Sequence, residues 1–150
     1  MPQSLSQVIV HVIYSTKNRV KSIDPPIRGR LHAYLATVLR DAGSYVYRVG
    51  GTANHIHAAC TLPRTLSQSD LIEKIKPPAS KWMKEQGPAY TGFSWQNGYG
   101  IFSVSRSRVQ KLVDYIDNQE EHHRHKTFKE EFLEFLDKCG VEYDERYLWD

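Results

Sequence analysis

The stretch VIVHVIY at residues 8–14 decides the fold. Every position in it except His11 is apolar or β-branched, so neither of its two alternating faces is polar. A strand with two apolar faces is covered on both sides in a folded protein. The stretch therefore predicts a strand that is buried on both faces, or nearly so.

The segment after this strand predicts a helix and then two further strands. Asp24 is a plausible N-cap ahead of two prolines, apolar residues then recur at helical spacing, and Gly43 ends the pattern. Aromatic and β-branched residues return in two short runs, which predict strands at residues 45–49 and 56–62.

The second half of the chain predicts helices around a hairpin. Ser67 can cap a helix, and this helix is expected to falter at residues 77–78, because two prolines remove backbone donors and crowd the preceding turn. Aromatic and β-branched residues on both sides of the Asn-Gly pair at 97–98 predict a hairpin. Capping-box patterns from Ser107 and Thr127 predict two more helices, the last ending at Gly140.

Strands joined by short connections and interrupted by helices predict an α+β fold, with helices packed on one face of an antiparallel sheet. The length of 150 residues suits one domain that spans residues 1–150. Hydrophobic residues make up 40% of the chain and charged residues 25%, which argues for a globular protein and against a disordered one.

Charge, cysteine usage and hydropathy limit the partners and the location. Lys and Arg total 20 against 17 Asp and Glu, a mild excess that permits a polyanionic partner without requiring one. Cys60 and Cys139 stand in no metal-ligand spacing and predict reduced thiols. The chain has no apolar run near the length of about 20 residues that a membrane span needs, and residues 1–4 lack a signal-peptide pattern. We therefore expect a cytoplasmic protein without a membrane partner.

Two histidines open one of the predicted strands. Because side chains alternate between the faces of a strand, His55 and His57 point the same way and can share one metal ion, while Ile56 faces the core. The alternative is two separately hydrogen-bonded histidines in a half-polar strand, and the triplet alone leaves it open.

A tyrosine and a glutamine lie one turn apart on the helix after Ser107. Tyr115 and Gln119 flank its apolar stripe, where a helix can present a hydroxyl and an amide to a cleft. A boundary aromatic and a surface amide are the alternative. His122 continues the same flank and is a further candidate for a metal or phosphate contact.

Basic and polar side chains at three places can contact a phosphate backbone. Arg106 and Arg108 stand at the start of the Tyr115 helix, beside its exposed N–H groups. The alternative is that these charges are simply solvated. The candidate nucleic-acid-binding residues are Lys17, Asn18, Arg19, Lys74, Lys81, Arg106 and Arg108.

In combination these motifs are more specific than any one of them. The sequence resembles the single-tyrosine transposases of the HUH superfamily, which include insertion-sequence and REP-associated tyrosine transposases and are named for a His-hydrophobe-His motif. The resemblance covers most of the chain. It is carried by STKNR at 15–19, GG at 50–51, HIH at 55–57, WQNGYG at 95–100, FSVS at 102–105, YIDNQ at 115–119, HH at 122–123 and EYDERY at 142–147.

The resemblance implies a ferredoxin-like or RRM-like fold, with His55 and His57 as metal ligands, Gln119 as a third ligand and Tyr115 as the nucleophile. It implies a divalent metal, Mg²⁺ or Mn²⁺, and cleavage and rejoining of single-stranded or hairpin DNA through a 5′-phosphotyrosine. It also implies a homodimer in which the tyrosine helix of one subunit commonly completes the histidine site of the other. Two departures stand out: Asn54 replaces an Asp frequent in the family, and two prolines interrupt the second helix.

Three other functions stay open at this point. A domesticated relative would act on repeated chromosomal palindromes without moving itself. A non-catalytic RRM-like nucleic-acid-binding module would need neither metal nor tyrosine, and it would carry exposed aromatic residues on its central strands. A replication-initiator nuclease shares the paired histidines but normally has a longer chain.

Overall fold

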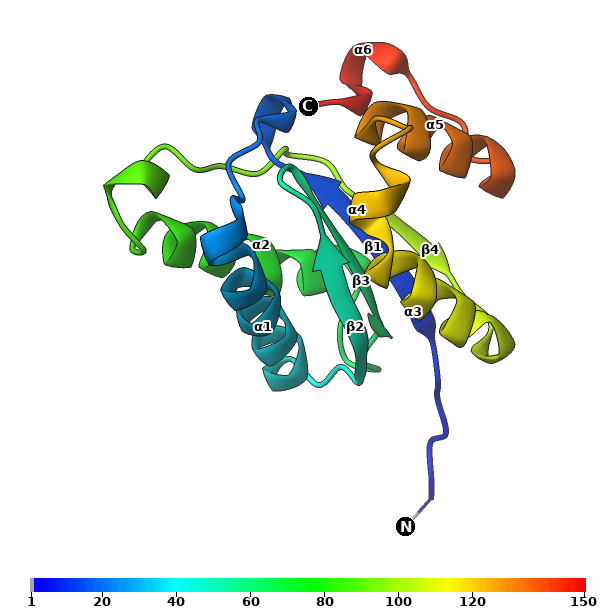
Figure 1. Cartoon of the computed structure of the whole chain (residues 1–150). Coiled ribbons are helices and arrows are strands. Elements are labelled where there is room, and N and C mark those ends of the chain that lie inside the picture. The colour runs from blue at the N-terminus through cyan, green and yellow to red at the C-terminus, as the bar shows by residue number, and fades with distance from the viewer. Residues whose placement is uncertain (1) are drawn as a thin grey trace.

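The computed structural model describes residues 2–150, and a four-stranded antiparallel sheet lies at its centre (Figure 1). The strand order is β2-β3-β1-β4. The strands are β1 Ile9–Ser15, β2 Val46–Gly51, β3 His55–Thr61 and β4 Gly100–Ser103. β1 pairs with β3 on one side and β4 on the other, and it is buried along its whole length, as the stretch at 8–14 predicts.

Helices cover both faces of this sheet (Figure 1). α1 (Pro25–Asp41) and α2 (Gln68–Lys84) pack on the face that carries Val10, Val12 and Tyr14. This half has the connectivity and layering of a ferredoxin-like domain, which confirms the predicted fold class. The described chain is completed by η1 Lys17–Arg19, η2 Pro88–Tyr90, η3 Arg106–Arg108, α3 Val109–Asp117, α4 Gln119–His122, α5 Phe128–Cys139 and α6 Glu145–Leu148.

The C-terminal helices form the third layer. Ile9 of β1 packs against α3, and Ile13 packs against aromatic residues of α5, so the second face of β1 is also buried. His11 lies between these two apolar clusters and is buried as well. The sheet face that a two-layer domain would leave to solvent is therefore an interior surface here.

α2 runs without interruption through Pro77 and Pro78, so the predicted break is wrong. The two prolines leave the carbonyls of Glu73 and Lys74 without helical donors, and both residues are exposed, so water can serve these groups. The buried residues on either side of the prolines keep one helical face against the core, from Leu71 to Met83. Packing thus outweighs the local preference of proline.

The predicted hairpin around residues 97–98 is also wrong. β4 pairs with β1, and Trp95 forms only an isolated bridge with Thr16. Lys76 explains the difference: its Nζ donates to the carbonyls of Gln96, at 2.6 Å, and Gly98, at 2.9 Å. This lysine fixes the segment against α2, so it does not turn back as a hairpin.

Helix capping follows the sequence at two of four places. The boxes at Ser67 and Thr127 both form, and α5 ends at Gly140 with a positive φ of 65°. The box at Ser107 is wrong because this residue lies inside η3 rather than ahead of α3. α1 begins after Asp24 as predicted, but the carboxylate accepts from the Tyr90 hydroxyl at 2.7 Å instead of capping the helix.

Gly50 sets how closely α3 approaches the sheet. A methyl group on Gly50 would lie 2.6 Å from Cγ2 of Ile116 and 3.3 Å from the Ile116 carbonyl oxygen. Both distances are far below ordinary van der Waals contact, so only glycine permits this packing. The helix that carries Tyr115 therefore depends on the missing side chain at position 50.

We expect Gly50→Ala to destabilise the protein by about 1–3 kcal/mol, because the added methyl overpacks the α3–β2 contact. Gly29→Ala is the matched control: Gly29 lies in α1 with no neighbouring atom within 4 Å of an added Cβ, so this change should stabilise the helix by about 0.4–1 kcal/mol. Urea unfolding measures both. A Gly50→Ala variant as stable as the wild type would show that α3 is not held this tightly.

Candidate active site

The paired histidines of β3 are fully buried and face the C-terminal helices. His55 and His57 have 0% exposure. Their outer nitrogens are held in place: Nδ1 of His55 lies 2.9 Å from Oδ1 of Asn54, and Nδ1 of His57 lies 2.7 Å from Nε2 of His11. Both Nε2 atoms are therefore turned toward one shared region, the arrangement that metal-binding imidazoles need.

Gln119 reaches this region from α4. The helix that the sequence predicts as continuous bends at Asn118, which separates α3 from α4. Gln119 is 1% exposed, and its Oε1 lies 2.8 Å from Nε2 of His55 and 3.0 Å from Nε2 of His123. This burial excludes the alternative that Gln119 is a surface amide.

Tyr115 enters from α3 and meets the same group of side chains. Its ring centroid lies 5.7 Å from that of His57 and 5.3 Å from that of His122. The phenol hydroxyl donates a hydrogen bond to Oε2 of Glu131, while Oε1 of Glu131 lies 3.2 Å from Nε2 of His57. A single chain thus brings together the imidazole pair, the amide and the phenol.

Glu131 of α5 is the central residue that the sequence analysis missed. It is 3% exposed and contacts residues from three other elements. A signal was present: Glu131 follows Phe128 by three positions and precedes Phe135 by four, so a carboxylate stands in the apolar stripe of an amphipathic helix. A charge in such a stripe is rarely buried without partners.

Burial and mutual contacts set the protonation of the site. Burial, with His57 beside it, lowers the pKa of His55 to about 3. Burial alone would raise the pKa of Glu131, but hydrogen bonds with His123 and His57 hold it well below its usual range. Burial and the adjacent carboxylate raise the pKa of Tyr115 well above its usual value. At neutral pH the site therefore holds a neutral imidazole at His55, an ionised carboxylate and a protonated phenol.

The donor set fits a divalent cation. Bonds of about 2.1 Å from an ion to its ligands place neighbouring ligand atoms about 3 Å apart. Nε2 of His55 and Oε1 of Gln119 are 2.8 Å apart, and the donor atoms of His55, His57 and Glu131 all lie within 4.8 Å of one another. Two imidazoles with amide and carboxylate oxygens suit Mn²⁺ and also Mg²⁺, Zn²⁺ or Ni²⁺.

Comparison with known proteins decides the family. The sequence matches the family described as "Transposase IS200 like" over residues 4–119. The chain belongs to this family. The match includes β1, both histidines of β3, Tyr115 and Gln119, and it ends before α5.

Two solved structures share the fold of this transposase. One is described as a transposase from Deinococcus radiodurans R1, with 18% identity, a TM-score of 0.61, and coverage of 79% of this chain and 98% of that chain. The other is described as a REP-associated tyrosine transposase bound to a REP hairpin, with 17% identity, a TM-score of 0.60, and coverage of 82% of this chain and 72% of that chain. No curated protein matches the sequence. Within residues 2–150 of the transposase, none of the helices is both long and apolar enough to cross a bilayer.

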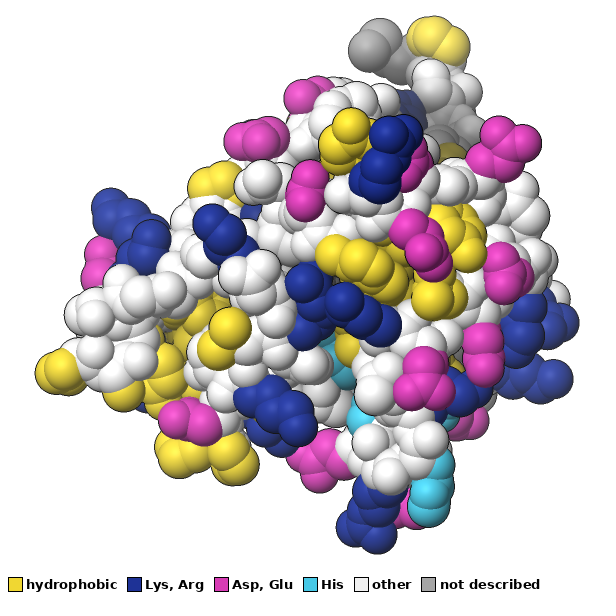
Figure 2. Space-filling view, turned by 90° about the horizontal axis from the view of Figure 1, so that it is seen from above, with side chains coloured by type: hydrophobic (Ala, Val, Ile, Leu, Met, Phe, Trp, Pro, Cys, Tyr) yellow, Lys and Arg dark blue, Asp and Glu magenta, His cyan; other side chains and the backbone are white. Residues whose placement is uncertain are grey.

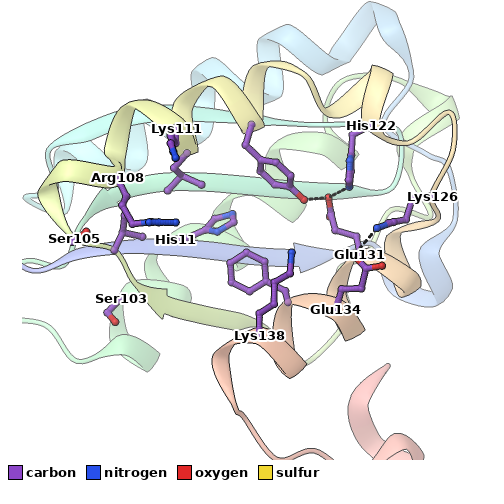
Figure 3. Close-up of a pocket in the computed structure, with 14 residues that line it drawn as sticks. His11, Ser103, Ser105, Arg108, Lys111, His122, Lys126, Glu131, Glu134 and Lys138 are labelled. Atoms are coloured by element: carbon purple, nitrogen blue, oxygen red, sulfur yellow. Dashed lines mark hydrogen bonds and ion pairs between the residues drawn. The ribbon is translucent and has the colours of Figure 1, made fainter.

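A cavity of about 460 Å³ opens beside the phenol of the transposase (Figure 3). Its walls include His11, Leu112, Tyr115 and Phe135, and Arg108 points into it toward His11. Further cations around it are Lys111, Lys126 and Lys138. The cavity therefore combines apolar walls with a cationic rim next to Tyr115.

The other predicted DNA contacts lie apart from this cavity. Arg106 sits over the Tyr47 ring at 6.0 Å, and Lys74 and Lys81 are on α2, across the sheet from Tyr115. Arg19 of η1 donates to the Trp149 carbonyl at 2.9 Å, and the adjacent Lys17 and Asn18 are exposed near the start of β3. On the face shown in Figure 2, Lys and Arg alternate with Asp and Glu and form no continuous basic stripe.

The neutral state of His55 predicts how stability depends on pH. In the unfolded chain His55 takes up a proton near pH 6.5, whereas in the folded chain it does so only near pH 3. Stability is therefore lost as pH falls from about 6.5 toward 3, at up to about 1.4 kcal/mol per pH unit for this group. In the presence of a chelator, His55→Gln should show a shallower loss in urea unfolding between pH 7.5 and pH 5.

His125→Gln provides the control, because His125 is exposed and should leave the slope unchanged. If His55→Gln and the wild type lost stability equally over this pH range, His55 would not be held neutral by burial.

Proposed function

We propose that this transposase cleaves and rejoins single-stranded DNA through a covalent 5′-phosphotyrosine on Tyr115, next to a metal centre held by His55, His57 and Gln119. One observation carries the proposal: the phenol hydroxyl and the Nε2 atom of His57 contact the two oxygens of the same carboxylate. A nucleophile and a metal-ligand pair that meet at one point, in a family of transposases, support phosphoryl transfer.

In this proposal His55, His57 and Gln119 hold a divalent ion, Mg²⁺ or Mn²⁺, and the hydrogen bonds from Asn54 and His11 keep both rings oriented. The bound ion supplies charge neutralisation at a non-bridging phosphate oxygen. Tyr115 attacks phosphorus, the bond from phosphorus to the 3′ oxygen breaks, and that oxygen receives a proton. A 3′ hydroxyl later attacks the phosphotyrosine and releases Tyr115, so rejoining needs no ATP.

The cavity beside Tyr115 supports a DNA contact at the cut. Its cationic rim can bind phosphates on either side of the scissile bond, and its apolar walls can accept a nucleobase. The relative described as bound to a REP hairpin supports hairpin DNA as the substrate of this chain too. A non-catalytic RRM-like module would not need a buried imidazole pair beneath a tyrosine, so the arrangement favours the enzyme.

The proposal also includes one domain over residues 1–150, a cytoplasmic location, and the homodimer that the resemblance implies. The contacts within one chain favour a tyrosine that serves its own histidine pair, because both parts already meet. A molar mass in solution of twice the chain mass would support the dimer.

The first test is formation of a covalent protein–DNA adduct. With single-stranded hairpin oligonucleotides and Mn²⁺ or Mg²⁺, the wild type should form an adduct that survives SDS. Tyr115→Phe should abolish it, because the attacking oxygen is gone, whereas Tyr45→Phe should not, because Tyr45 is exposed at the start of β2. Chelator and His57→Ala should weaken the adduct strongly, and Gln119→Ala should weaken it partly, because water can replace one oxygen ligand.

The nucleophile would be wrongly assigned if Tyr115→Phe kept the adduct. A metal-independent reaction would instead refute the role of the histidine pair.

The second test concerns the cationic rim. Combined replacement of Arg108 and Lys111 by Gln should weaken binding of a hairpin oligonucleotide and flatten its salt dependence by about 0.7 log units per lost phosphate contact. Arg40→Gln on α1 is the control, because Arg40 is exposed on the α1–α2 side of the sheet. Binding titrations across a series of salt concentrations measure both effects. Equal salt slopes for the wild type and the rim variant would place the DNA elsewhere.

A further inference from the structure

α5 places a buried carboxylate between the histidine pair and the tyrosine. Oε1 of Glu131 lies 3.2 Å from Nε2 of His57 and 3.9 Å from Nε2 of His55. The other oxygen, Oε2, accepts from the Tyr115 hydroxyl and lies 3.3 Å from Nε2 of Gln119. Each oxygen of this one carboxylate therefore has its own set of partners.

We propose that Glu131 is a fourth ligand of the metal centre, supplied through Oε1. This inference rests on the metal centre of the proposed function. Oε1 already lies near the separation of about 3 Å that neighbouring ligands of one ion adopt. A carboxylate oxygen is also the ligand that Mg²⁺ and Mn²⁺ prefer, and it adds a negative charge that two imidazoles and an amide lack.

The second oxygen gives Glu131 an additional role. With Oε1 on the ion and Oε2 on the Tyr115 hydroxyl, the carboxylate fixes the phenol at a set distance from the metal. Glu131 thereby acts as a positioning residue for Tyr115 as well as a ligand. The ligand set then comes from β3, α4 and α5, with the nucleophile on α3.

A second possible ligand set shares the same carboxylate. Oε2 of Glu131 lies 3.2 Å from Nε2 of His123 and 3.1 Å from Nε2 of His122, which is not oriented to form a hydrogen bond. His122 is half-buried, whereas His55 and His57 are fully buried and held at Nδ1. The geometry favours the β3 pair, and variants at His57 and His122 distinguish the two sets.

The experiment measures Mn²⁺ binding to the full chain by isothermal titration calorimetry and by electron paramagnetic resonance of the free ion. Glu131→Gln should weaken Mn²⁺ affinity by about 10-fold or more, and His57→Ala by at least as much. Glu134→Gln is the matched control, because Glu134 lies one turn further along α5 and is exposed to solvent. It should bind Mn²⁺ as the wild type does, as should His122→Ala.

Circular dichroism establishes that each variant is folded. If Glu131→Gln does not fold, Glu131→Asp replaces it; this variant keeps the charge but withdraws the oxygen, and it should also weaken Mn²⁺ binding. Wild-type affinity in the folded Glu131 variant, together with weak binding by His57→Ala, overturns the fourth ligand but leaves the proposed function intact. Weak binding by His122→Ala with normal binding by His57→Ala places the ion in the other set and overturns the inference. No Mn²⁺ binding by the wild type overturns both proposals.

Discussion

The functional face of the molecule depends on one buried carboxylate and the groups that satisfy it. An ionised side chain that is 3% exposed is stable only with close partners, and Glu131 finds them on β3, α3 and α4. These contacts tie α5 to the rest of the site. The hydrogen bond that satisfies the charge also aims the Tyr115 hydroxyl at the histidine pair, so stability and reactivity share the same interaction.

Much of the fold could be predicted because the sheet obeys a simple alternation. A stretch that is apolar on both faces predicted a covered central strand, and glycines, capping residues and prolines predicted where most helices begin and end. The errors arose where long-range contacts override local preference. Packing keeps α2 continuous through Pro77 and Pro78, and the ammonium group of Lys76 binds the carbonyls that a hairpin turn would have needed.

The site was predictable to the extent that its residues are near one another in sequence. The spacing of His55 and His57 predicted that they face the same way, and the spacing of Tyr115 and Gln119 predicted a shared flank. Spacing carries no information on which elements meet across the fold, so Glu131 and His11 were missed although each is a polar residue in an apolar pattern. The roles of the ligands and the nucleophile remain proposals that the geometry supports.

The position of α5 has a consequence for how this chain relates to others of its family. The segment shared with the family ends at residue 119, yet Glu131 and the cations Lys126 and Lys138 come from beyond it. A chain shortened at that boundary would keep the imidazoles and the phenol but would expose Ile13 and Phe102 to water. Such a surface invites self-association. The final thirty residues are therefore as much a lid for the sheet as a wall of the catalytic chamber, and variation among relatives in this region would alter solubility and chemistry together.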